Sequence, residues 1–139
     1  MPEGDLIQAI TDTRQQIDFI WQVFITVHIA LFALLFIYSE AIDAWNALAR
    51  IFALGGIAAF DYINGKALGD TYLLLGSMHD QFRQFFGSQV ENFHPNFYER
   101  FVLAEYADRP QMVLITHGFA FGVVFVVLVA RQLIHRAAR

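Results

Sequence analysis

Two histidines lie within apolar segments of this sequence and are its clearest candidates for chemistry. His28 stands in the middle of an apolar run from Phe19 to Tyr38, and His117 stands near the start of a second run from Gln111 to Leu133. Ionisable groups inside a bilayer are costly and usually face the interior of a helical bundle. Because two imidazoles on facing helices could ligate a haem iron or a copper ion, His28 and His117 are candidate cofactor-binding residues.

A structural role would explain the same two histidines without any cofactor. A neutral imidazole is tolerated in a membrane helix when it hydrogen bonds to a backbone carbonyl, to Thr26 or Thr116, or to a neighbouring helix. Metal-bound histidines also need an outer hydrogen-bond partner, and the sequence does not place a carboxylate beside either one. Both roles stay open from the sequence.

Two charged residues interrupt a further apolar segment, at 42–63. Arg50 lies close enough to one end of this segment to extend its guanidinium outward to the membrane surface, while Asp61 lies near the other end. In an oligomeric channel, Arg50, Asp61 or His28 could form a ring around a pore. We therefore count Arg50 and Asp61 as intramembrane polar residues with a possible functional role.

The remaining ligand types give little support for a metal site or an active site. The chain has no cysteine, which excludes disulfides, zinc–thiolate sites and iron–sulfur clusters. Several acidic and histidine residues lie in the polar part, but their spacing matches no defined ligand pattern: His79, Asp80, Glu91, His94 and Glu99. No catalytic motif is present, and we predict no catalytic residues and no metal ligands.

The composition predicts that most of this chain lies within a lipid bilayer. Of its 139 residues, 57% are hydrophobic and 16% are charged, against about 25% charged in an average soluble domain. Since roughly 20 apolar residues in a helix cross a bilayer, segments 18–39, 42–63 and 111–134 are predicted transmembrane helices. The middle one could instead be a surface-lying or re-entrant hairpin. The predicted fold is an all-α, small polytopic membrane helical bundle in one domain.

The rest of the chain is predicted to form shorter helices around this bundle. Residues 1–17 read as an amphipathic lead-in, and Asn64-Gly65 reads as a turn. Residues 67–86 place apolar side chains at helical spacing on one face, which predicts an amphipathic helix at the interface or docked on the bundle. Residues 87–110 form an extramembrane segment, with a short helix expected to begin at Pro95.

Glycines in two predicted spans indicate helix packing. Gly118 and Gly122 form a GxxxG motif, which lets another helix approach closely, and Gly55-Gly56 lies in the middle of the second span. The chain also has 15 phenylalanines, more than three short spans can bury. We therefore expect these surfaces to pack against other subunits.

Topology follows from an odd number of spans. Three crossings put the N-terminus and residues 64–110 on one side and the C-terminus on the other. Positive charges near the span ends slightly favour a cytoplasmic C-terminus in a bacterial inner membrane, with four on the C-terminal side and three opposite: Arg50, Arg131, Arg136 and Arg139 against Arg14, Lys66 and Arg109. The acidic N-terminus predicts that the first span is not a cleaved signal. The net charge of −4 argues against a nucleic-acid partner.

These observations favour a non-catalytic integral membrane protein. It would act as a homo-oligomeric or accessory subunit of a membrane complex, with the lipid bilayer, further copies or other membrane subunits as partners. A haem- or copper-binding redox subunit that uses His28 and His117 is the first alternative. An oligomeric channel is the second.

Overall fold

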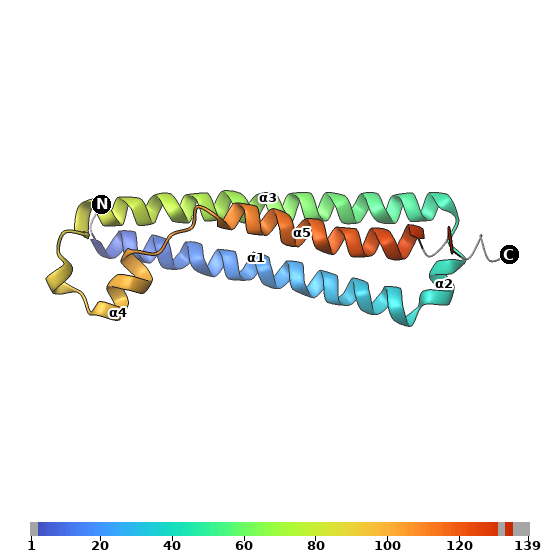
Figure 1. The fold of residues 1–139 in the computed structure, drawn as a ribbon, viewed down its shortest axis with the longest axis horizontal. Coiled ribbons are helices and arrows are strands. Elements are labelled where there is room, and N and C mark those ends of the chain that lie inside the picture. The colour runs from blue at the N-terminus through green and yellow to red at the C-terminus, as the bar shows by residue number, and fades with distance from the viewer. Residues whose placement is uncertain (1–2, 131–132, 135–139) are drawn as a thin grey trace.

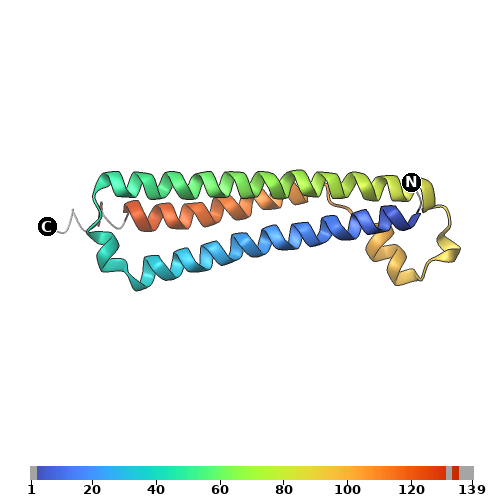
Figure 2. The ribbon, with the colours of Figure 1, turned by 180° about the vertical axis from the view of Figure 1, so that it is seen from behind.

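Three long helices make up most of the computed structural model, which describes residues 3–130 and 133–134. They are α1 (Glu3–Ile37), α3 (Ala47–Phe86) and α5 (Arg109–Phe125), and α5 continues into the π-helix η3 (Val126–Ala130). The chain runs along α1, returns along α3 and runs forward again along α5, with all three side by side (Figures 1 and 2). Shorter helices connect them: α2 (Ser39–Asp43), η1 (Val90–Asn92), α4 (Pro95–Phe97) and η2 (Tyr98–Val102). The described residues contain no strand, which confirms the all-α prediction.

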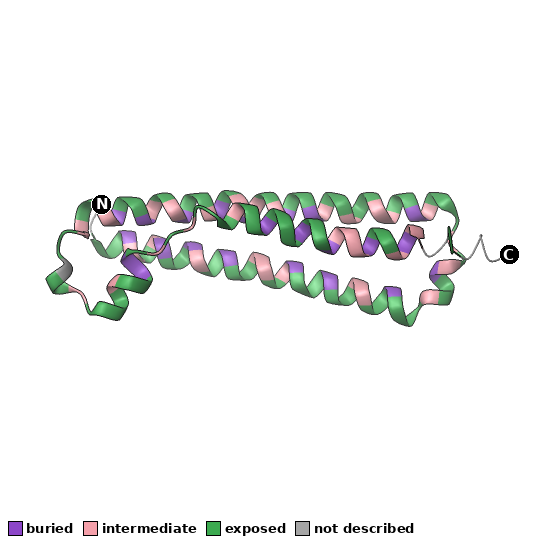
Figure 3. Ribbon diagram, viewed as in Figure 1, coloured by how far each residue is buried: buried purple, intermediate pink, exposed green. Residues whose placement is uncertain are grey.

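Each long helix is apolar enough and long enough to cross a membrane. The 22 residues of α5 and η3 span about 33 Å, close to the roughly 30 Å of a hydrocarbon core. The outer faces of all three helices are exposed (Figure 3) and carry large apolar side chains that are at least 64% exposed, among them Phe19, Ile29, Phe36, Phe52, Leu114 and Phe119. Such a continuous apolar surface is stable against lipid and not against water. The predicted membrane bundle is confirmed.

Helices α1 and α3 are longer than the membrane requires. Their 35 and 40 residues span about 52 and about 60 Å, and the excess of both lies at the same end, beyond the start of α5 (Figure 1). We call this part the stalk: residues 3–17 of α1, residues 70–86 of α3, and the segment 87–108 folded against them. Asp18, Lys66 and Arg109 lie where the stalk meets the predicted membrane surface.

The predicted turn at Asn64-Gly65 is wrong, because α3 runs through it without a break. Neither residue has a positive φ, and the Asn64 side chain is buried, bonding to neighbouring helices instead of closing a turn. The predicted span 42–63 and the predicted amphipathic helix 67–86 are therefore parts of one helix. The apolar stripe of the second part packs along α1 and buries Leu68, Leu75 and Phe82 almost completely.

The connection between α1 and α3 is longer than the two residues left between the predicted spans 18–39 and 42–63. The short helix α2 comes first, and α3 begins at Ala47 and not at residue 42. Asn46 sets this start, since its side chain accepts a hydrogen bond from the Ala49 amide at 2.8 Å, as a good N-cap does. Because α3 then continues as one helix through Gly55-Gly56, no re-entrant hairpin is formed there.

The stalk has an apolar core, which continues through Leu68 and Val113 into the membrane part of the bundle. A buried apolar cluster joins α1, α3 and η2, and the short helix predicted from Pro95 is confirmed, with His94 as its N-cap. Arg14 of α1 donates to the Tyr106 hydroxyl at 2.6 Å and lies over the Phe101 ring, 5.2 Å from its centroid. This arginine therefore ties the segment 98–106 to the helical hairpin.

Replacing Tyr106 by Phe is expected to loosen this segment without unfolding the bundle. The change removes the acceptor of the Arg14 hydrogen bond and leaves the ring packing in place. A partly buried hydrogen bond to a charged group contributes about 1 kcal/mol, so amide hydrogen exchange in residues 98–108 should accelerate roughly fivefold. Exchange in residues 20–35 serves as the internal control. Unchanged exchange at 98–108 would show that the bond does not hold the segment.

Candidate functional site

Four polar side chains meet in the membrane part of the bundle. His28 of α1, Asp61 and Asn64 of α3, and His117 of α5 are each at most 8% exposed, and we call them the intramembrane cluster. Each of the three spans contributes, and an apolar run surrounds His28 and His117 in the sequence. Buried polar groups at this depth are costly unless they bond to one another.

One half of the cluster joins His117 to Asn64. The His117 Nδ1 atom lies 2.9 Å from the Val113 carbonyl of its own helix, and its Nε2 atom lies 2.9 Å from Asn64 Oδ1. The Asn64 amide nitrogen in turn donates to the Ile20 carbonyl of α1 at 3.3 Å. Gly65 leaves room for this approach, because a Cβ at that position would lie 3.3 Å from the His117 ring, closer than an ordinary van der Waals contact. This half links all three spans.

The other half joins His28 to Asp61. The His28 Nδ1 atom lies 3.0 Å from the Phe24 carbonyl, and its Nε2 atom lies 3.3 Å from Asp61 Oδ1, without the alignment of a full hydrogen bond. Neither carboxyl oxygen of Asp61 has another hydrogen-bond partner among the described residues. Asp61 is thus a buried carboxyl group whose one close polar neighbour is an imidazole.

The two histidines lie near one another, but they do not point at a common centre. The Phe24 ring packs against both imidazoles, with centroid distances of 4.2 Å to His28 and 4.0 Å to His117. Their Nε2 atoms face Asp61 and Asn64 respectively. A haem iron or copper ion would need these nitrogens to turn towards one point. Haem or copper binding stays a prediction that an absorption spectrum and elemental analysis of the purified protein can test.

The Arg50 guanidinium extends outward towards the end of the span, in the predicted direction, but it is buried there and not open to solvent. Arg50 is 4% exposed and donates to the backbone carbonyls of Ile42, Asp43, Trp45 and Leu128. These carbonyls belong to the end of α2, the loop after it and the π-helix η3. Carbonyls at helix ends lack partners within the helix and carry partial negative charge. Arg50 therefore ties the end of α2 to the end of the last span.

The four predicted packing glycines all lie on outer faces. A Cβ added to Gly55, Gly56, Gly118 or Gly122 would meet no atom within 4 Å. The GxxxG motif therefore does not join α5 to another helix of this chain. Gly118 and Gly122 instead line a shallow apolar groove on the lipid-facing side, together with Phe119, Val123, Val126 and Val127.

The polar residues of the stalk are not assembled into a metal site. His79 is fully buried between the rings of Phe101 and Tyr106, whereas Asp80 faces outward and His94 caps α4. Within the described residues, no group of three or more histidine and acidic side chains is arranged so that it could hold a metal ion. Among the residues of the positive-charge comparison, Arg131, Arg136 and Arg139 lie outside the described residues.

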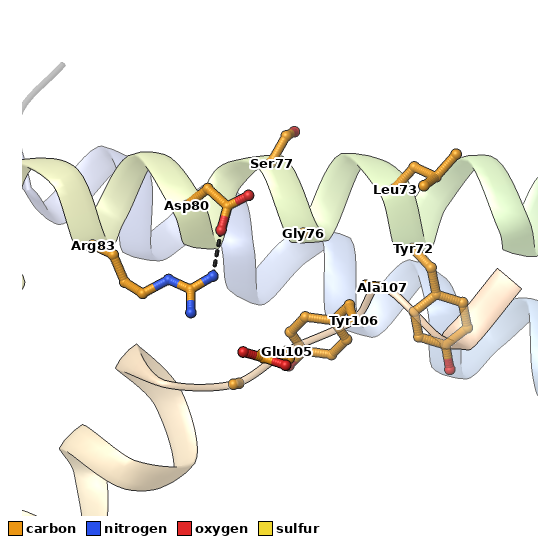
Figure 4. Close-up of a pocket in the computed structure, with 10 residues that line it drawn as sticks. Tyr72, Leu73, Gly76, Ser77, Asp80, Arg83, Glu105, Tyr106 and Ala107 are labelled. Atoms are coloured by element: carbon orange, nitrogen blue, oxygen red, sulfur yellow. Dashed lines mark hydrogen bonds and ion pairs between the residues drawn. The ribbon is translucent and has the colours of Figure 1, made fainter.

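A polar groove of about 450 Å³ lies on the stalk between α3 and residues 104–107 (Figure 4). Asp80 and Arg83 form an ion pair on one wall, and Glu105 lies across from them. Asp80 and Glu105 are exposed and Arg83 is partly exposed. This groove lacks the burial that gives a charged side chain a strong interaction with a ligand, so the intramembrane cluster is the better candidate site.

The sequence did not identify Asn64 as a site residue. Asparagine before glycine is a strong turn signal, and that signal was misleading here. The spacing of Asp61, Asn64 and Leu68 was a better signal, because it places all three residues on one face of a helix. All three are buried.

Fold and site together define a small polytopic helical membrane protein with three candidate spans and a polar cluster between them. Comparison with protein-family models, with curated proteins and with solved structures gives no match. The function must therefore be argued from the chain's own residues.

Proposed function

We propose that this protein is a non-catalytic membrane subunit that assembles laterally with further copies or with other membrane proteins. The observation that carries the proposal is the position of Gly118 and Gly122. Both lie one turn apart on the outer face of α5, with open space beside them. Membrane helices associate through such small residues, because their backbones can then approach closely.

The surroundings of this motif favour a helix as the occupant of the groove. Phe119 is 73% exposed and Val126 is 57% exposed, and they stand beside the glycines as ridges that a partner helix could pack between. A second open glycine pair, Gly55-Gly56, lies on the outer face of α3. Two open faces on different helices would allow a ring of identical copies or a chain held between two partners.

The positions of the buried charged residues give less support to an oligomeric channel than the glycines give to lateral assembly. Arg50, Asp61 and His28 are buried within the bundle of a single chain and do not face a neighbouring copy. A pore lined by them would run through one chain, where their hydrogen bonds and apolar neighbours fill the space. A bacterial inner membrane with a cytoplasmic C-terminus stays our expectation for location and orientation.

Replacing Gly122 by Leu is expected to break the assembly and leave the chain folded and inserted. A Cβ at this position meets no atom of its own chain within 4 Å, and the leucine side chain would fill the groove that a partner helix would enter. Native mass spectrometry and sizing in mild detergent should show a smaller species, and proteins that co-purify with the wild type should be lost.

A matched control is Gly4→Leu, which places the same side chain at an open glycine of the stalk, outside the membrane. It should leave the oligomer and the co-purifying proteins unchanged. If Gly122→Leu gave the same assembly as the wild type, or if the wild type were monomeric and free of partners in the native membrane, the proposal would fail.

A further inference from the structure

The hydrogen bonds of the intramembrane cluster show which of its atoms need a proton between them. A backbone carbonyl only accepts, so Nδ1 of His28 must carry the hydrogen that faces the Phe24 carbonyl. In a neutral imidazole the Nε2 atom then has no hydrogen. Nε2 of His28 nevertheless faces Asp61 Oδ1 at 3.3 Å, and two bare lone pairs at that distance would repel. One proton must therefore lie between them, on the carboxyl group or on the imidazole.

The same assignment of hydrogen-bond donors and acceptors can be made for His117. Its Nδ1 atom must donate to the Val113 carbonyl, while its Nε2 atom faces Asn64 Oδ1, which also only accepts. The amide is held in this orientation because its nitrogen donates to the Ile20 carbonyl. A proton on Nε2 of His117 would complete this chain of hydrogen bonds. The cluster thus offers a second place for a proton, on the α5 side of Asp61.

We propose that Asp61, His28 and His117 form a proton-binding site inside the membrane, which exchanges protons with water only at the stalk end of the bundle. The ligand is a proton and not a metal ion, because the imidazole nitrogens that would bind a metal are directed at Asp61 and Asn64. A buried carboxylate in lipid is stable only with a proton or a cationic neighbour. The titratable groups on the helices packed against Asp61 are His28 of α1, whose Nε2 atom faces the carboxyl group, and His117 of α5, which lines the same crevice as Asp61 and bonds to Asn64.

A crevice on one side of the site leads towards the stalk. This crevice of about 300 Å³ between α3 and α5 has Asp61 and His117 among its lining residues, and Lys66 and Pro110 line it at the level where the stalk begins. Beyond these residues, Trp21 donates to the Tyr72 hydroxyl at 3.1 Å, and Arg14 donates to Tyr106. Polar side chains therefore continue from the cluster into the stalk.

The other side of the site is sealed by apolar side chains. An apolar cluster of residues from all three spans lies between Asp61 and Arg50. Leu35, Val124 and Leu128 are among its buried members, and the partly buried side chains of Leu31, Phe32, Leu54 and Ile57 pack against them. Since a proton cannot cross such a layer without water, exchange is confined to the stalk side.

Labelling with dicyclohexylcarbodiimide tests the site directly. In apolar surroundings this reagent reacts with protonated carboxyl groups: the carboxyl proton moves to a carbodiimide nitrogen, the carboxyl oxygen bonds to the central carbon, and a covalent adduct remains. In the full-length protein in native membranes, peptide mass mapping should find the adduct on Asp61. The labelling rate should fall at least about fivefold between about pH 6 and about pH 9, as the proton is lost.

Variants separate proton binding from a merely structural role. Asp61→Asn should lose the adduct, while Asp70→Asn, at an exposed acid of the same helix, should keep it. His28→Gln keeps a hydrogen-bond donor but removes the base that competes for the proton. Labelling of Asp61 should then be faster and change less than about twofold over the same pH range. Because mapping of the wild type locates the adduct by itself, the result does not depend on whether a variant folds.

Sidedness is tested in sealed vesicles. The chain has no cysteine, so a single Ser88→Cys variant reports through an impermeant thiol reagent whether the stalk faces outward. Labelling of Asp61 should follow the pH of the stalk side alone. An unlabelled or pH-independent Asp61, a response to the opposite side, or protection by zinc or copper ions would each overturn the proposal. None of these results depends on lateral assembly.

Discussion

Replacing His28 by Leu is expected to lower the free energy of unfolding by about 3 kcal/mol at neutral pH, because it leaves Asp61 buried without its one close polar neighbour. Breaking a buried pair costs more than the pair contributes, since the remaining group keeps its full desolvation cost. The loss should shrink as the pH falls towards the usual pKa of an aspartate, because the proton that the buried Asp61 needs is then bound in the unfolded state as well. Unfolding in mixed micelles, followed by circular dichroism at several pH values, measures it.

The double variant His28→Leu, Asp61→Leu is the control for this expectation. It removes both members of the pair and should recover most of the stability lost in the single variant, because no buried charge remains. Its stability should also be nearly independent of pH. If the two substitutions were additive, Asp61 and His28 would not interact in the folded protein.

The sequence was sufficient to predict the membrane class and the three crossings, because these depend only on the length of the apolar runs. The α1 and α5 runs contain no charged residue between Phe19 and Ser39 or between Gln111 and Ala130, and the structure contains a long helix at each. The hydrophobicity of a whole span is the sum of many side-chain contributions, so a single polar residue does not change the prediction of a transmembrane helix.

The site was predicted only in part, because it depends on partners that lie far apart along the chain. His28, His117 and Asp61 were each identified as polar residues within apolar segments, but the pairing of His28 with Asp61 joins residues 33 positions apart. The register of α1 against α3 decides that pairing, and it is set by packing along the full length of both helices. Local pattern carries no information about it.

The error at Asn64-Gly65 has a related cause. Local preference favours a turn there, but the continuous helix buries the Leu68, Leu75 and Phe82 face against α1 and places Asn64 against His117. Tertiary packing outweighs a preference that amounts to about 1 kcal/mol per residue. The same packing extends α3 beyond the membrane and creates the stalk, which hydropathy alone could not show.

A second substitution with a large expected effect on stability is at Arg50. Replacing it by Met is expected to cost about 3 kcal/mol, because carbonyls of Ile42, Asp43, Trp45 and Leu128 lose a buried charged donor. The substitution keeps most of the side-chain volume, so lost packing contributes little. The α1–α3 connection should open locally, and hydrogen exchange at residues 39–46 should accelerate at least about tenfold, since the guanidinium holds both α2 and the end of η3.

Two further variants show whether the guanidinium geometry or only the positive charge is required. Arg50→Lys keeps the charge but has a single nitrogen, which cannot reach carbonyls in so many directions, so an intermediate loss is expected. Arg83→Met makes the same change at a partly exposed arginine of α3 that forms an ion pair with Asp80, and it should cost less than about 0.5 kcal/mol. An Arg50→Met protein with wild-type exchange at 39–46 would mean that the helix ends are held by packing alone. If exchange accelerates there and not in the stalk, the two ends of α3 are stabilised independently, and the intramembrane cluster lies between two separately anchored helix ends.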